Sequence, residues 1–223
     1  MKSLAVLFFI LAGASFLQAQ TLADLSFGRT EVFEPLPPLP ADDSLPMMVK
    51  PRLLPENISF MEKGLWGEDG LFRTTGIASP LTPESRKSEL SLRRTMLVAH
   101  QIGGFVTLGC MISAIYFGQK ILNGDRGYVT NHKIFVTATI TSYSLTGLLA
   151  VLSPPPLIRR NESSTITIHK TLAWVHFTGM VLTPILGSMI SRRATDSQIA
   201  HFHQISAYTT ATALAASLIV ITF

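Results

Sequence analysis

Charged side chains are scarce in this chain, and they are scarcest after Arg94. Only 14% of the 223 residues are charged, whereas an ordinary soluble domain has about 25%. Beyond Arg94 the chain repeatedly shows stretches without Asp, Glu, Lys or Arg that are long enough to cross a lipid bilayer. This shortage of charge predicts an integral membrane protein rather than a soluble domain.

The chain has a single cysteine, and its apolar stretches lack carboxylates. Cys110 is the only cysteine, so the chain can form no intrachain disulfide and no cysteine-ligated zinc or iron–sulfur site. The apolar stretches contain no Asp or Glu, which argues against a transporter for divalent cations, because such sites commonly use carboxylates. The net charge of +4 comes from Lys and Arg residues that flank apolar stretches, so we expect no nucleic-acid partner.

The amino terminus has the layout of a secretory signal peptide. Lys2 precedes an apolar run from Leu4 to Leu17, and small or polar residues surround Ala19. We therefore predict a signal peptide over residues 1–20, with an uncleaved membrane anchor as the competing interpretation. In either case the following residues, 21–94, would lie outside the cytoplasm.

Residues 21–94 are rich in proline, most densely at 33–40, and are expected to be mostly irregular. One denser patch at 60–73 alternates aromatic and aliphatic residues with glycine. This patch would either dock on the membrane domain or a partner, or form a partly ordered linker at the membrane interface. The sequence favours the linker.

Four apolar stretches follow, and each has about the 20 residues that a transmembrane helix needs. They span residues 95–118, 134–153, 171–190 and 198–223. Because the bilayer core offers no water to satisfy backbone groups, these stretches must be helical. The short connections predict antiparallel neighbours, and thus an all-α, four-helix transmembrane bundle over residues 95–223.

The signal peptide predicts the orientation of this multi-pass protein in a cell membrane, with a bacterial inner membrane as the expected one. With residues 21–94 extracytoplasmic, the first and third helices run inward, and the second and fourth run outward. The Lys and Arg residues of the loops point the other way, since more of them would then lie outside than inside. We give the signal peptide more weight, because export of the first segment usually fixes the topology.

Histidines lie near the helix ends in a regular arrangement. Five are at or near helix starts and one lies two turns deeper: His100, His132, His169, His201 and His203, and then His176. Ionisable groups in a bilayer are costly and are functional candidates by default, although an interfacial histidine costs less. Alternating helix direction sorts four of them into two pairs, His100 with His169 at the outer face and His132 with His203 at the inner face. Two imidazoles at one depth on neighbouring helices form an axial pair for haem iron.

Two of these four assignments have alternates. His201 and His203 point about 200° apart on a helix, so only one of them faces the bundle, and His203 is preferred because it lies deeper. His176 shares a face with His169 and could replace it, in which case the other histidine would bind a haem propionate or line a proton or quinol path. His169 is the preferred ligand. Basic residues near helix ends, Lys133 among them, could pair with propionates, but boundary anchoring is the favoured interpretation.

These motifs resemble the cytochrome b561 superfamily, in which four core helices each give one histidine and alternate helices pair to hold two haems. The run Val-Ala-His-Gln-Ile-Gly-Gly-Phe at 98–105 resembles the first core helix. His132 followed by Gly147, the run at 168–174 around His169, and His203 at the start of the last helix are similar to the other three. The histidines are 32, 37 and 34 residues apart, similar to the family's roughly even spacing. The resemblance covers residues 96–223, and no ascorbate site maps onto it.

The histidine pairs and the resemblance together predict a b-type cytochrome with two haem b groups, each ligated by two histidines. Such iron has no open position, so the expected activity is electron transfer between the membrane faces, as a cytochrome or as the membrane part of an oxidoreductase. Electrons would come from a quinol or from a redox protein. The chain would work alone, as a homodimer or within a larger redox complex. The alternative is a haem-free membrane anchor or assembly subunit whose histidines are merely interfacial.

Overall fold

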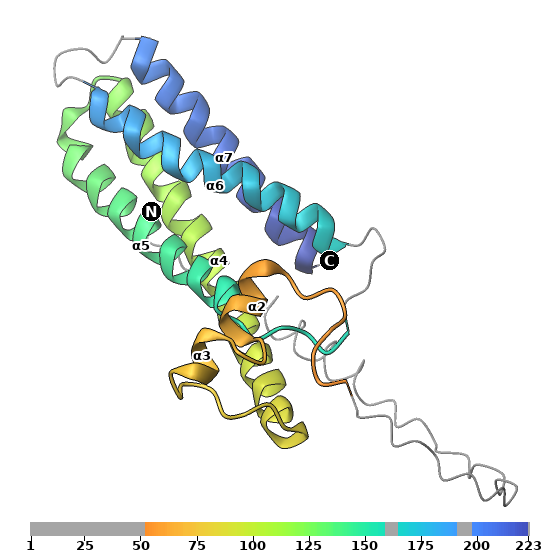
Figure 1. Cartoon of the computed structure of the whole chain (residues 1–223). Helices are drawn as coiled ribbons and strands as arrows, with labels where there is room; N and C mark the ends of the chain where they lie inside the picture. The colour runs from red at the N-terminus through yellow and green to blue at the C-terminus, as the bar shows by residue number, and fades with distance from the viewer. Residues whose placement is uncertain (1–51, 159–164, 191–197, 223) are drawn as a thin grey trace, which may run out of the picture. The chain divides into compact units, whose positions relative to one another are not determined.

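The computed structural model describes residues 52–158, 165–190 and 198–222. The predicted signal peptide at 1–20, the proline-rich run at 33–40, and the basic residues at 159–160 and 192–193 lie outside this part of the chain. Within it, every regular element is a helix, and four long helices form a bundle (Figure 1). The predicted all-α fold is confirmed.

The long helices are α4 (Pro83–Leu122), α5 (Val129–Val151), α6 (Thr165–Met189) and α7 (Gln198–Thr222). Each is long and apolar enough to cross a membrane, and the short 3₁₀ turn η1 (Arg126–Tyr128) runs directly into α5. The structure thus has four candidate membrane spans, as predicted for a multi-pass membrane protein, and their length and apolar composition suit a lipid bilayer.

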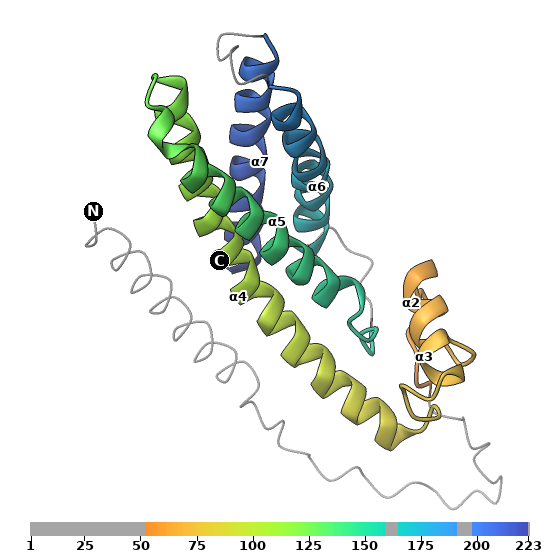
Figure 2. The same cartoon turned by 90° about the vertical axis from the view of Figure 1, so that its left-hand side faces the viewer.

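Helix α4 begins at Pro83, well before the predicted start near residue 95. Thr82 and Ser85 form a capping box, in which each hydroxyl accepts a hydrogen bond from the other residue's backbone N–H, at 3.1 and 2.9 Å. Hydropathy marks only the part of a helix that lies in hydrocarbon, so the charged first turns are not visible as a span. The 40 residues of α4 are about 60 Å long, twice the thickness of the hydrocarbon layer, and α4 extends beyond the other helices (Figure 2).

Helices α5 and α6 also begin earlier than predicted. They start at Val129 rather than near residue 134 and at Thr165 rather than near residue 171. The reason is the same, because the helices continue past the hydrocarbon layer into polar sequence. As a result, His132 and His169 lie about one turn inside their helices.

The helices pair into two hairpins. Helix α4 lies along α5, α6 lies along α7, and the hairpins meet chiefly through α4 and α7 (Figure 1). Glycine permits close approach within each hairpin: a Cβ on Gly103 would lie 2.2 Å from Thr146 Oγ1, and one on Gly179 would lie 1.9 Å from Thr210 Oγ1. We call α4–α5 the first hairpin and α6–α7 the second hairpin.

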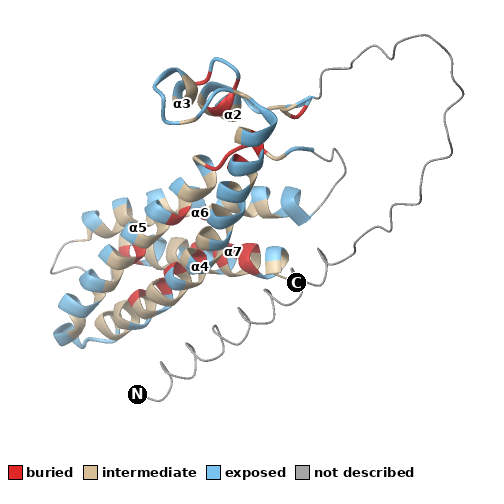
Figure 3. Ribbon diagram, turned by 90° about the horizontal axis from the view of Figure 1, so that it is seen from below, coloured by how far each residue is buried: buried red, intermediate tan, exposed pale blue. Residues whose placement is uncertain are grey.

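Many large apolar residues of the bundle are exposed, and many of its buried residues are small or polar. Figure 3 colours the ribbon by burial and shows exposed positions along the four long helices. Thr107, Thr210 and Ser217 are at most 1% exposed, whereas Leu145 and Trp174 are at least 60% exposed. Lipid tails are as apolar as leucine, so membrane helices gain from packing small residues and hydrogen-bonding groups against each other. The distribution of side chains therefore fits a bundle surrounded by hydrocarbon.

Two short helices, α2 (Phe60–Trp66) and α3 (Leu71–Thr74), precede α4. The Trp66 side chain is 5% exposed, and its indole N–H donates a hydrogen bond to the Leu152 carbonyl at the end of α5, at 3.0 Å. Of the two interpretations of residues 60–73, the structure shows docking on the membrane domain and not the partly ordered linker that the sequence favoured.

A buried ion-pair network ties this segment to the first turns of α4. Glu89 pairs with Arg73 at 2.8 Å and with Arg86 at 2.5 Å, and all three side chains are at most 7% exposed. Arg86 also donates hydrogen bonds to the carbonyls of Leu53 (2.8 Å) and Pro155 (3.0 Å). Because buried charges are tolerated only when they are paired, this Glu89 network fixes α3, α4 and the loop after α5 to one another.

Candidate functional site

His100 of α4 and His169 of α6 face each other across the two hairpins. Their ring centroids are 6.2 Å apart, and the rings are nearly perpendicular, at 83°. The His100 Nδ1–H donates to the Thr146 carbonyl of α5 at 2.8 Å. His169 Nδ1 lies 3.2 Å from the carbonyl and 2.7 Å from the hydroxyl of Ser217 on α7. Each ring is thus held by the other helix of its own hairpin, and we call these two residues the first pair.

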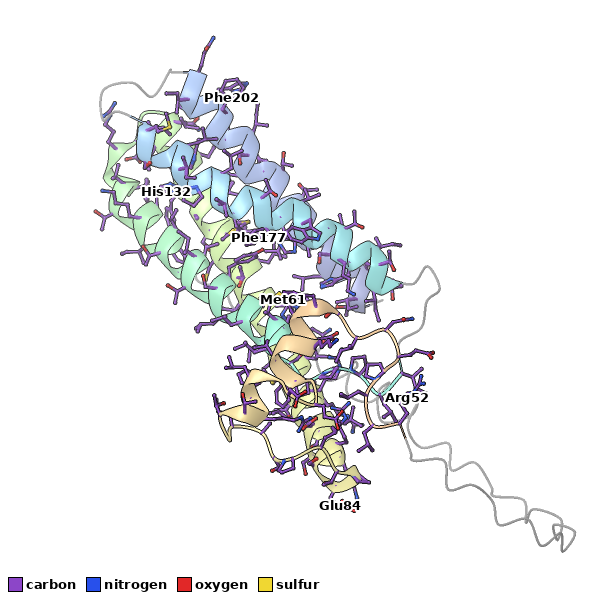
Figure 4. The ribbon with its side chains drawn as sticks, in the orientation of Figure 1. Arg52, Met61, Glu84, His132, Phe177 and Phe202 are labelled. Atoms are coloured by element: carbon purple, nitrogen blue, oxygen red, sulfur yellow. The ribbon has the colours of Figure 1, made fainter. Side chains whose placement is uncertain are left out.

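His132 of α5 and His203 of α7 form an equivalent second pair. Their ring centroids are 6.3 Å apart, with an angle of 82° between the rings. The His132 Nδ1–H donates to the Ala114 carbonyl at 2.8 Å, and the His203 Nδ1–H donates to the Thr183 carbonyl at 2.9 Å. His132 lies toward the end of the bundle that is far from Glu84 at the start of α4 (Figure 4). The two pairs therefore lie toward opposite ends of the bundle.

The backbone carbonyls fix the protonation of the rings. A carbonyl oxygen can only accept, so His100, His132 and His203 carry their proton on Nδ1. The other ring nitrogen, Nε2, then has a free electron pair, which is the form of imidazole that binds a metal ion. A ring N–H bonded to a carbonyl or carboxylate is the usual support of a metal-ligating histidine.

The distance between the rings suits two imidazoles that share one metal ion. A metal–imidazole bond is about 2.0 Å long and the ring centroid lies about 1.1 Å behind the bonding nitrogen, so two opposite ligands have centroids about 6.2 Å apart. The two pairs have 6.2 and 6.3 Å. Among the described residues no group of three or more His, Cys, Asp or Glu side chains could hold a metal ion. Pairs of histidines instead suit a metal ion whose other ligands belong to a macrocycle.

The two alternates lie outside both pairs. His176 is 8% exposed, and its Nδ1 is hydrogen-bonded to the Tyr143 hydroxyl at 2.9 Å. His201 is exposed on α7. The structure thus brings together the four preferred histidines and places the alternates elsewhere. That the four bind haem iron stays a prediction.

The distance between the two pairs along the bundle follows from the rise per residue of α4. On α4, His100 belongs to the first pair, and Ala114, fourteen residues later, holds the second pair through its carbonyl. With a rise of 1.5 Å per residue, the two levels are about 21 Å apart. Since the hydrocarbon layer is about 30 Å thick, the pairs can lie near its two faces. His176 lies seven residues after His169, about midway between the two levels.

The two hairpins repeat one layout, which the intervals between histidines alone do not reveal. In α4 and α6, the histidine is followed by a carbonyl acceptor 14 residues later and by a glycine 18 residues later; in α5 and α7 the acceptor again follows the histidine by 14 residues. The corresponding residues are His100 and His169, Ala114 and Thr183, Gly118 and Gly187, His132 and His203, and Thr146 and Ser217. A search for internal repeats would have found these acceptors and glycines, which reading each histidine by itself missed.

The repeated glycines make room for the rings of the second pair. A Cβ on Gly118 would lie 3.1 Å from Cε1 of His132, and a Cβ on Gly187 would lie 2.9 Å from Cε1 of His203. Each glycine comes one turn after the residue whose carbonyl holds that ring. A larger side chain would push the imidazole off its carbonyl, so glycine is part of the support of the site.

A cavity of about 660 Å³ adjoins the second pair. All four long helices line it, and both His132 and His203 reach it. Small-molecule and cofactor sites commonly enclose about 300–1,000 Å³. The hairpins contact each other chiefly through α4 and α7, and the cavity lies among side chains of both hairpins.

Comparison of the chain with protein family models, with curated proteins and with solved structures finds no match. The resemblance to the cytochrome b561 superfamily therefore rests on the four histidine motifs, and the site has to be judged from its own geometry.

Proposed function

We propose that this protein is a dihaem b-type cytochrome that carries electrons between the two faces of a membrane. His100 and His169 would ligate one haem, and His132 and His203 would ligate the other. The donor would be a quinol or a redox protein, and the chain would serve as a cytochrome or as the membrane part of an oxidoreductase.

The observation that carries the proposal is the geometry of the two pairs. Both have ring centroids at the separation expected for two imidazoles on opposite sides of one iron. Three of the four rings present Nδ1–H to a backbone carbonyl, and the fourth, His169, bonds to Ser217. Neutral imidazoles oriented in this way fit haem iron, whereas histidines that merely anchor helix ends have no need to be paired and locked.

The residues also fit the rest of a haem. The cavity at the second pair is large enough for a macrocycle, and the glycines beside the rings leave its approach open. A bound haem supplies one-electron redox chemistry. Two histidines per iron fill both axial positions, so the protein would leave no open position for oxygen or substrate.

The chain itself would fix the positions of the four histidine rings and separate the electron path from water. Each hairpin gives one histidine to each pair, so the four rings are fixed only when both hairpins are in place. Between the two levels lie buried residues such as Thr107 and Thr139, which keep bulk water out of the path. With the levels about 21 Å apart, a haem at each pair would lie toward one face of the membrane, as an electron path across a bilayer requires.

The test is the colour of the purified protein and its loss in single variants. The wild type should contain two haems and show the reduced-minus-oxidised bands of low-spin haem b. His100→Ala and His132→Ala should each lose about one haem, because one axial ligand of one site is gone. His201→Ala, a change to an exposed histidine next to the second pair, should keep both. A colourless wild type would leave the haem-free membrane anchor as the function.

The choice of ligands has its own control. His176→Leu removes the buried alternate and should leave two haems, since His176 is bonded to Tyr143 and not to a pair. Loss of one haem in His176→Leu, with retention in His169→Ala, would reverse the assignment. Rapid reduction by a quinol but not by ascorbate would then identify the class of electron donor.

A further inference from the structure

The docked helix α2 has two different faces. Its buried Trp66 is bonded to the bundle, whereas Phe60 and Met61 at its start are exposed. Trp66 lies about 120–140° around the helix from these two side chains. Lys63 is also exposed and lies one turn after Phe60, so the two are neighbours on the helix surface. We call Phe60, Met61 and Lys63 the outer face of α2.

The bond that holds α2 lies where the bundle leaves the hydrocarbon layer. The indole N–H of Trp66 donates to the Leu152 carbonyl, and the apolar stretch of α5 ends at residue 153. Figure 4 shows Met61 at the end of α2 next to the bundle, whereas Glu84 at the start of α4 lies far from it. Lipid headgroups occupy about 5–8 Å on each side of the hydrocarbon layer. The outer face of α2 is therefore at the level of the headgroups.

Helix α3 has an apolar side chain of similar exposure at another level. Leu71 is 53% exposed and Met61 is 55% exposed. Arg73 of α3 pairs with Glu89, which lies six residues before the apolar stretch that begins at residue 95. With a rise of 1.5 Å per residue, Glu89 is about 9 Å outside the hydrocarbon layer, beyond the headgroups. We therefore expect lipid beside α2 and water beside α3.

We propose that the outer face of α2 binds the lipid surface, with Phe60 and Met61 among the upper acyl chains and Lys63 at the phosphates. Short helices with an apolar face and a flanking cation lie in the plane of a membrane interface, and the flexible stem of lysine lets its ammonium group reach the phosphates. This contact continues the exposed apolar surface of the bundle, which includes Leu145 and Trp174.

Lipid is favoured over a protein partner because of this level. A protein that covered Phe60 and Met61 would have to displace the headgroups beside the bundle. The preceding segment would then be held twice, by the bundle through Trp66 and the Glu89 network and by the bilayer through the outer face of α2. The inference goes beyond the proposed function and does not depend on it, since a chain without haem would have the same contact.

The experiment compares the depth of the two equally exposed side chains. In the full chain with Cys110→Ser, a nitroxide is attached to Met61→Cys or to Leu71→Cys, and the protein is placed in bilayer nanodiscs. Oxygen concentrates in lipid, whereas a nickel chelate stays in water. The ratio of oxygen to nickel collisions, measured by electron paramagnetic resonance, should be severalfold higher at position 61 than at position 71. Equal ratios would overturn the inference, and water-like values at both positions would leave the outer face of α2 to a protein partner.

A second measurement tests the part of Lys63. In nanodiscs that contain anionic phospholipid, Lys63→Gln should lower the collision ratio at position 61, because the attraction to the phosphates is lost. Lys87→Gln is the matched control, since Lys87 is an exposed lysine on α4 that lies eight residues before the apolar stretch, about 12 Å outside the hydrocarbon layer. It should leave the ratio unchanged. Equal effects of the two substitutions would show a general influence of net charge, and the contact between Lys63 and the phosphates would be wrong.

Discussion

The two ends of the bundle hold their histidines in the same way and differ in what surrounds them. At the end near the first pair, Trp66 is bonded to the end of α5, and the Glu89 network fixes the preceding segment to α4. At the end near the second pair, a cavity opens beside His132 and His203. Because the histidines are equivalent and their surroundings differ, the two sites would coordinate a metal ion similarly but would differ in how easily a ligand reaches them.

The repeat within the chain sharpens this comparison. Position 107 in the first hairpin corresponds to position 176 in the second, and position 143 corresponds to position 214. The first hairpin has Thr107 and Tyr143 at these places, and the second has His176 and Leu214. The hydrogen bond between Tyr143 and His176 is therefore a point where the molecule departs from its own symmetry.

The largest expected effect comes from breaking the Glu89 network. Glu89→Gln leaves the buried Arg73 and Arg86 without a carboxylate, and removing one partner of a buried ion pair costs about 3–5 kcal/mol. We expect the segment with α2 and α3 to detach from α4 at a much lower temperature. Trp66 fluorescence during heating, in a Trp174→Phe background, measures this transition.

The control is an ion pair of the same chemistry in solvent. Arg52 pairs with Glu56 at 2.8 Å, and their side chains are 67% and 76% exposed. Arg52→Gln should leave the Trp66 transition where it is, because an exposed pair adds little to stability. If Glu89→Gln altered the second pair as strongly as it altered the docking of the segment with α2 and α3, the two ends of the bundle would not be independent.

The next effect concerns the glycine that supports the second pair. Gly187→Ala would bring a methyl group to 2.9 Å from Cε1 of His203, so the ring must move away from the Thr183 carbonyl. Overpacking of this kind costs about 1–3 kcal/mol. The haem content of the second site should fall while that of the first site is kept, as read from the spectra of purified protein.

Gly147 offers a matched control for that change. A Cβ on Gly147 meets nothing within 4 Å. Gly147→Ala should therefore be neutral or slightly stabilising, by up to about 1 kcal/mol, since alanine is the better helix former. Equal losses in both variants would point to the helices rather than to the ring of His203.

Much of this architecture could be predicted from the sequence because its signals are local. Uncharged runs of membrane-spanning length gave the four helices, and alternating direction gave the grouping of His100 with His169 and of His132 with His203, which face each other in the structure. Helix geometry showed that only one of His201 and His203 can face the bundle, since two residues two positions apart cannot face the same way, and the greater depth of His203 decided between them.

What could not be predicted depends on contacts between distant positions. His100 is held by Thr146, 46 residues away, which only a comparison of the two hairpins would have singled out. Trp66 meets Leu152, 86 residues away, and no sequence pattern identifies Leu152 as its partner. The early start of α4 was not predicted, because hydropathy identifies only the residues inside the hydrocarbon layer, whereas the helix continues beyond it. The capping box at Thr82 was the available local signal.

A smaller effect is expected where the repeat departs from symmetry. Tyr143→Phe removes the hydroxyl bonded to the buried His176 and leaves its Nδ1 without this partner, at a cost of about 1–2 kcal/mol in the free energy of unfolding. Both haems should be retained, since neither pair uses Tyr143. Thermal unfolding followed by circular dichroism measures the loss. A Tyr143→Phe protein that lacked the haem of the first pair would instead make this tyrosine part of that site.

The smallest expected effect is at the bond between Trp66 and Leu152. Replacing Trp66 by 3-benzothienylalanine keeps a bicyclic aromatic ring in the buried position and removes the indole N–H, so the Leu152 carbonyl loses one hydrogen bond, worth about 1 kcal/mol. The segment should stay docked, because the Glu89 network is intact. Hydrogen exchange of the α2 amides should quicken severalfold, while the amides of α7 near the second pair exchange as before. Equal acceleration at both ends would mean that the docked segment stabilises the whole bundle, and the difference between the two ends would then be one of access rather than of stability.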